Sequence, residues 1–80
     1  MSHKGLDTRS KLGRAVFALV DQSIKLSVDH RTRIARIRSL IEADPEDAMV
    51  KFKISSDLDA LAREPRISST VMMLRKALPS

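Results

Sequence analysis

The sequence predicts an all-α fold of three or four helices, arranged as an antiparallel helical hairpin or a small bundle whose second arm is kinked at a proline. Apolar residues recur at helical spacing along most of the chain, and no segment alternates convincingly at period two. The chain also contains only 2 Gly and 3 Pro, so few positions interrupt a helix. Its 80 residues suffice for one domain. We expect a flexible polar head over residues 1–9 and a single helical domain over residues 10–80.

The first predicted helical segment has an unusually wide apolar face. At about 100° per residue, the apolar side chains between positions 12 and 26 span about 200°, whereas an ordinary surface helix needs little more than about 100°. We therefore expect neighbours on two sides of it. Ile34, Ile37 and Ile41 keep the same phase. Residues 10–43 therefore form either one helix or two, with a break near Ser27 to Asp29 as the alternative.

The second half carries its own helix boundaries. Asp44 is the expected N-cap of a helix with Pro45 at its first position, and an apolar stripe follows at Val50, Ile54, Leu58 and Leu61. Pro65 is expected to end or kink this helix. Ser68 can cap a last helix, whose apolar stripe contains Val71, Leu74 and Leu78.

The charge distribution is uneven. The formal net charge is +5, and residues 1–43 carry all of this excess, because residues 44–80 contain equal numbers of acidic and basic side chains. Such a balance favours an acidic protein partner or nucleic acid. Phe17 and Phe52 are the only aromatic residues, which excludes base stacking of the kind that single-strand binders use.

Four arginines are candidate contacts for phosphate or for an acidic partner: Arg31, Arg33, Arg36 and Arg38. On a helical wheel they form two pairs on either side of the isoleucine stripe. In the alternative interpretation they only frame that stripe, with their aliphatic stems along its edges and their guanidinium groups in water.

Residues 58–74 resemble the helix-turn-helix of bacterial repressors, with Ala62, Ile67 and Ser68 at the spacing of that family. The motif is degenerate, since Pro65 and Arg66 stand at the turn glycine and Thr70 arrives one residue early. The resemblance implies a basic DNA-binding regulator with this motif at 57–78. It places four side chains near the groove: Arg66, Ser69, Thr70 and Met73. The alternative is a helix pair that packs Val71 and Leu74 into the core.

The chain is also similar to subunits of type III secretion needles. The similarity lies in its size and in an expected hairpin with a Pro-containing turn at residues 44–46. This resemblance implies a helical-hairpin subunit of a secretion-type assembly, with residues 68–71 in the terminal arm. It assigns no site residues.

We predict that the chain is not an enzyme. It lacks a Gly-rich phosphate loop and a nucleophile elbow, and His3 and His30 stand alone, so no catalytic residue is assigned. With no cysteine and no clustered ligands, we expect no cofactor and no metal. No apolar run approaches the roughly 18 to 20 residues of a membrane span, so we expect a cytoplasmic protein without membrane contact.

The remaining expectation is a binding or regulatory protein that acts through contact with a protein partner or with itself, most simply as a dimer. The excess width of the first apolar face motivates it. The expected interface consists of five residues: Leu12, Val16, Phe17, Val20 and Ile24.

Overall fold

A computed structural model describes residue 7 and residues 9–79. Within this part of the chain the secondary structure is entirely helical, without strands, which confirms the all-α prediction. The elements are α1 (Lys11–Gln22), the short 3-10 helix η1 (Ser23–Lys25), α2 (Val28–Ala43), α3 (Val50–Lys53), α4 (Ser55–Ala62) and α5 (Ser68–Ala77). The predicted head over 1–9 lies outside the described residues, apart from Asp7 and Arg9.

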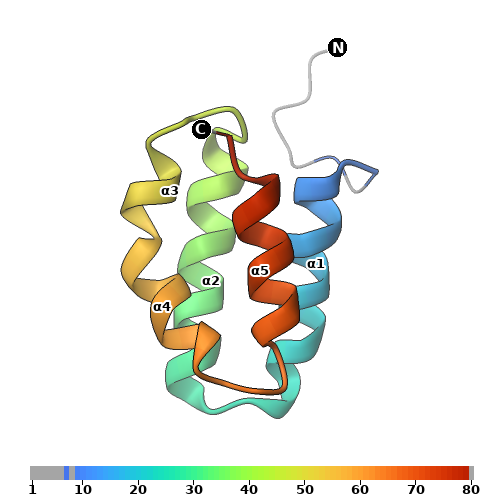
Figure 1. The fold of residues 1–80 in the computed structure, drawn as a ribbon, viewed down its shortest axis with the longest axis vertical. Helices are drawn as coiled ribbons and strands as arrows, with labels where there is room; N and C mark the ends of the chain where they lie inside the picture. Colours follow the sequence, from blue (N-terminus) through green and yellow to red (C-terminus); the bar gives the residue numbers. More distant parts are fainter. Residues whose placement is uncertain (1–6, 8, 80) are drawn as a thin grey trace.

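The helices form four arms that run alternately up and down (Figure 1). α3 and α4 together make one arm, which breaks at Ile54. Around the bundle α1 packs against α2, α2 against α4, α4 against α5, and α5 back against α1. Pro65 lies in the turn between α4 and α5, where the chain reverses direction. The second half therefore folds into two arms in place of one kinked arm.

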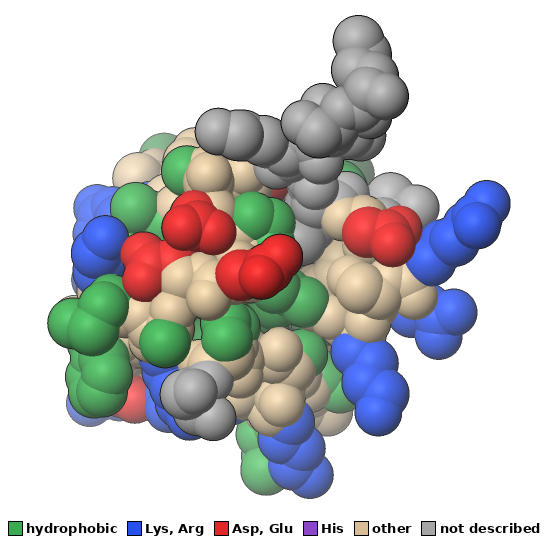
Figure 2. Space-filling model, turned by 90° about the horizontal axis from the view of Figure 1, so that it is seen from above, with side chains coloured by type: hydrophobic (Ala, Val, Ile, Leu, Met, Phe, Trp, Pro, Cys, Tyr) green, Lys and Arg blue, Asp and Glu red, His purple; other side chains and the backbone are tan. Residues whose placement is uncertain are grey.

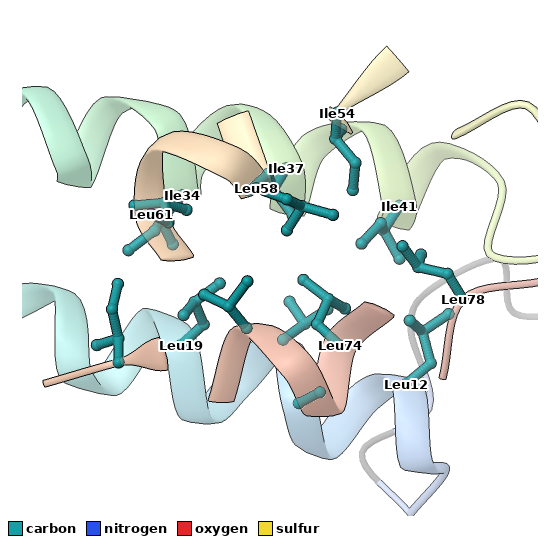
Figure 3. Close-up of a cluster of buried hydrophobic side chains, with 14 of the residues drawn as sticks. Leu12, Leu19, Ile34, Ile37, Ile41, Ile54, Leu58, Leu61, Leu74 and Leu78 are labelled. Atoms are coloured by element: carbon teal, nitrogen blue, oxygen red, sulfur yellow. The ribbon is translucent and has the colours of Figure 1, made fainter. Parts of the chain in front are cut away.

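The core lies between two layers of helices (Figure 3). Ile34, Ile37 and Ile41 of α2, with Leu58 and Leu61 of α4, point toward side chains of α1 and α5. All of the predicted stripes are buried. The full core comprises Leu12, Ala15, Val16, Leu19, Leu26, Ile34, Ile37, Ile41, Val50, Ile54, Leu58, Leu61, Ile67, Val71, Leu74 and Leu78.

The segment between residues 10 and 43 forms two helices. The Ser10 hydroxyl caps α1 by accepting from Gly13 N at 2.9 Å. The Ser27 hydroxyl caps α2 by accepting from His30 N at 3.3 Å, after Leu26 has taken an extended conformation. The single long helix is therefore wrong, and the break near Ser27 is the correct alternative. Separate serine caps let each helix turn its own apolar face inward.

The predicted helix start at Asp44 is also wrong. Residues 44–49 form a loop, in which Asp44 Oδ1 accepts from Glu46 N at 3.2 Å and Asp47 Oδ1 accepts from Met49 N at 2.9 Å. These carboxylates satisfy the amides of consecutive turns, so the helix begins only at Val50. Ser68 is likewise not a cap, because it is already the first residue of α5 and Ile67 precedes it without a side-chain cap.

Candidate functional site

Two of the four candidate arginines of α2 are bound by the carboxylate of Asp57 in α4. Arg33 Nη1 donates to Asp57 Oδ1 at 3.0 Å, and Arg36 Nη1 donates to the same oxygen at 3.2 Å. Asp57 is only 1% exposed. A buried carboxylate is costly unless charged donors satisfy it, so these arginines hold α2 and α4 together.

Asp29 adds a second carboxylate to this cluster. Its Oδ2 lies 3.3 Å from Arg33 Nε, one helical turn earlier on α2. The hydrogen bond to Asp29 and the negative charge of that group raise the pKa of the Arg33 guanidinium above its ordinary value, and Asp57 adds to this effect. Arg33 therefore stays cationic, but its charge is largely compensated within the fold.

Arg38 and Arg31 lie on the side of α2 that faces α1. The Arg38 guanidinium carbon lies 5.5 Å from the centre of the Phe17 ring, and Arg38 Nε donates to Glu42 Oε2 at 3.1 Å. This cation–π contact covers part of the apolar face of α1, as a framing arginine would. Arg31 is exposed and has no ion pair among the described residues. The four arginines therefore do not form one free basic surface.

The predicted interface residues, which lie in α1 and, for Ile24, in η1, separate into three environments. Leu12 and Val16 belong to the core, Phe17 and Val20 are half-buried toward α2, and Ile24 is 74% exposed. Because α1 packs against both α2 and α5, much of the wide apolar face is covered within one chain. The part that the fold leaves exposed or half-buried comprises Phe17, Val20 and Ile24.

The side chains that the helix-turn-helix resemblance brings to a DNA groove do not share one surface. Thr70 is buried, whereas Ser69 and Met73 are exposed. Arg66 Nε donates to Glu64 Oε1 at 3.0 Å within the turn before α5. Val71 and Leu74 pack into the core, as the alternative interpretation of this helix pair expected.

An exposed apolar surface on α3 was not anticipated from the sequence. Phe52 is 72% exposed and Met49 is 57% exposed. Two surface cavities flank Phe52, one of about 360 Å³ beside Met49, Leu58 and Arg75, and one of about 560 Å³ beside Arg33 and Arg63. We call Met49, Phe52 and these cavities the α3 surface. The available signal was that Met49 and Phe52, three residues apart, both fall outside the stripe that starts at Val50.

Asp57 is the other residue that sequence reasoning missed. The overlooked signal is its position three residues after Ile54 and four before Leu61, which places it on the buried face of the helix. An acid at such a position requires a cationic partner, and α2 supplies two.

One histidine contact resembles part of a catalytic arrangement. Ser27 Oγ lies 2.8 Å from His30 Nδ1, at the exposed start of α2. The same oxygen accepts from the His30 backbone, so the pair forms a helix cap. In the part of the chain that the structure describes, no cluster of three or more His, Cys, Asp or Glu side chains could hold a metal ion. Each helix described there is too short or too polar to pass through a lipid bilayer.

Comparison with protein-family models gave no match, and comparisons with curated proteins and with solved structures found no significant similarity.

Proposed function

We propose that this chain is a small non-enzymatic helical protein that binds or regulates other proteins by direct contact. The observation that carries the proposal is the exposed ring of Phe52 between two surface cavities. Aromatic and methionine side chains are enriched at the centres of protein interfaces, where they fill pockets of the partner. We infer that the occupant of the α3 surface is a partner protein that presents apolar side chains to Met49 and Phe52.

The completeness of the core supports this proposal. Sixteen apolar side chains are buried within one chain, so folding does not require Phe52 or Met49 to be covered. Phe52 and Met49 instead form a contiguous exposed apolar surface, and such surfaces mark sites of interaction. The cytoplasm is the proposed compartment, since the chain has no cysteine with which to form a disulfide.

Self-association forms the second part of the proposal. A twofold dimer would use Ile24 and the half-buried pair Phe17 and Val20, beside a cavity of about 330 Å³ that Arg31 and Arg38 also line. Ile24 supplies most of the exposed apolar area of this surface.

A DNA-binding regulator is the second candidate function, favoured by the net charge of +5 and by Arg31, which is exposed and has no ion pair among the described residues. It ranks lower because Asp57 and Asp29 compensate Arg33 and Arg36, and because Thr70 is buried. Phosphate recognition depends on cations that are free to displace counterions.

Photo-crosslinking tests the proposed function. A photoreactive phenylalanine analogue replaces Phe52 in one variant, and replaces the exposed Asp21 in a matched control. We expect discrete protein adducts from position 52 that excess unmodified chain competes away, and none of them from position 21. The same adducts from both positions would contradict the proposal.

A further inference from the structure

A second surface, separate from the α3 surface, lies where α1 and α5 pack together. A groove of about 320 Å³ is lined by Lys11 and Arg14 of α1 and by Met73, Lys76 and Ala77 of α5. We call it the α1/α5 groove. It shares no lining residue with the two cavities beside Phe52.

The cations of this groove have no ion pair among the described residues. Lys11, Arg14 and Lys76 are exposed, and no described carboxylate lies within ion-pair distance of them. Elsewhere in the bundle, the structure pairs six other cations with acids: Arg33, Arg36, Arg38, Lys53, Arg66 and Arg75. Figure 2, which views the bundle from the end where α1 begins, shows Lys and Arg side chains projecting on the side of α1 and α5. Three positive charges that pair with no described carboxylate therefore surround one small groove.

The floor of the groove is apolar. Met73 is 51% exposed, and Ala77 lies one helical turn further along α5. Methionine is flexible and polarisable, so it adapts to an apolar side chain of varied shape. The aliphatic stems of Lys11 and Lys76 can extend this floor while their charged ends stay in water.

We propose that the α1/α5 groove binds an acidic amphipathic segment of a partner protein. An apolar side chain of that segment packs on Met73 and Ala77, and its carboxylates face Lys11, Arg14 and Lys76. Charge complementarity would steer the encounter and fix the orientation, while the apolar contact would supply most of the affinity, because exposed ion pairs alone are weak.

A nucleic acid fits this groove less well. The phosphate backbone offers negative charge but no apolar group for Met73, and a DNA-binding surface gains affinity by adding phosphate contacts along the duplex. The groove instead places three cations around a cavity of about 320 Å³ with an apolar floor. This pattern matches a partner segment with an apolar face bordered by acidic side chains.

Fluorescence anisotropy with three labelled probes tests the proposal. The first is a helical peptide of about 18 residues with glutamates on one face and leucines on the other. The second is polyglutamate of equal charge, and the third is duplex DNA. Each is titrated with the full chain between roughly 20 mM and 300 mM salt. We expect the amphipathic peptide to bind at least about tenfold tighter than polyglutamate, and its affinity to fall as salt rises.

Matched variants assign the binding to the groove. Lys11→Glu with Lys76→Gln should weaken peptide binding about tenfold or more and flatten its salt dependence. Lys25→Glu with Arg63→Gln makes the same change in net charge at exposed cations outside the groove, and should alter binding less than about twofold. Met73→Gln should weaken binding about five- to tenfold with the salt dependence unchanged. Circular dichroism confirms that each variant keeps its helicity.

Several outcomes would overturn the proposal. The first is no binding of the amphipathic peptide at low salt, and the second is an equal loss of peptide affinity in the groove variant and the control variant. The others are polyglutamate that binds as tightly as the amphipathic peptide, and duplex DNA that binds more tightly than it. A Phe52→Ser variant should bind the peptide normally. Peptide binding therefore tests the groove proposal alone, whereas the photo-crosslinking from position 52 tests the function proposed for the α3 surface.

Discussion

Arg36 of α2 and Asp57 of α4 share a hydrogen bond of 3.2 Å across the bundle, although they lie 21 residues apart in the chain. Arg33 donates to the same carboxylate oxygen at 3.0 Å. The most basic segment of the sequence is therefore used in part to neutralise a buried acid. This assignment separates a structural role for α2 from the binding roles proposed for α3 and for the α1/α5 groove.

Removing the charge of Asp57 should destabilise the fold. We expect Asp57→Asn to lower the free energy of unfolding by about 1 to 3 kcal/mol, since hydrogen bonds between charged groups are lost in a buried site. Asp59→Asn is the matched control on the same helix, because Asp59 is an exposed carboxylate that pairs with Arg75. It should cost about 1 kcal/mol or less. Urea denaturation followed by circular dichroism measures both, and equal midpoints for the two variants would contradict the role of Asp57.

Removing the two arginines that bind Asp57 should also destabilise the fold. We expect Arg33→Gln with Arg36→Gln to lower the free energy of unfolding at least as much as Asp57→Asn, because the carboxylate then stays buried without its partners. Arg31→Gln with Arg63→Gln removes two exposed arginines that pair with no described acid, and should leave the urea midpoint nearly unchanged. If both double variants keep the original midpoint, the arginines of α2 do not support the fold.

The ion pair between Arg66 and Glu64, in the turn before α5, should stabilise the fold to an extent that depends on pH. The hydrogen bond from Arg66 lowers the pKa of Glu64 below its ordinary value of 4.5. A depressed carboxylate pKa stabilises the folded state above the unfolded pKa, and this stability is lost as the pH falls through the folded pKa. Glu64→Gln should therefore lower the urea midpoint near about pH 7 but make no difference near about pH 2. A pH-independent effect of this substitution would contradict the ion pair.

Self-association through α1 should be removable without unfolding the chain. Because Ile24 is largely exposed, we expect Ile24→Glu to yield a folded monomer with unchanged helicity by circular dichroism. Lys25→Glu is the neighbouring control and should retain the dimer. Sedimentation equilibrium at high micromolar concentration measures the mass, and a monomeric unmodified chain would rule out the dimer.

The buried stripes could be predicted from the sequence because apolar residues at helical spacing lie on one face of a helix, and that face packs into the core. Ile34, Ile37 and Ile41 recur at helical spacing, and they are buried in the structure. The start of α3 could not be predicted in this way. Asp44 and Pro45 suit a turn as well as a helix cap. Only the structure shows that the carboxylates of Asp44 and Asp47 accept hydrogen bonds from backbone amides of the loop.

The candidate sites were less predictable because they depend on contacts between distant parts of the chain. The pairing of Arg33 with Asp57 spans 24 residues, so no local pattern reveals that α2 compensates an acid of α4. The α1/α5 groove likewise combines Lys11 with Lys76, which approach only when the first and last helices pack together. The position of Phe52 outside the Val50 stripe indicates an exposed side chain, but the two cavities beside it combine residues of α2, α3, α4 and α5.

The salt dependence of association with duplex DNA tests the central claim most directly, which is that Arg33 and Arg36 serve the fold and not phosphate binding. Each phosphate contact contributes about 0.9 to the slope of log affinity against log salt. For any DNA association of the unmodified chain, Arg33→Gln with Arg36→Gln should leave this slope unchanged while lowering the urea midpoint. A slope that falls by about 1 to 2 in the double variant, with the midpoint unchanged, would contradict the account.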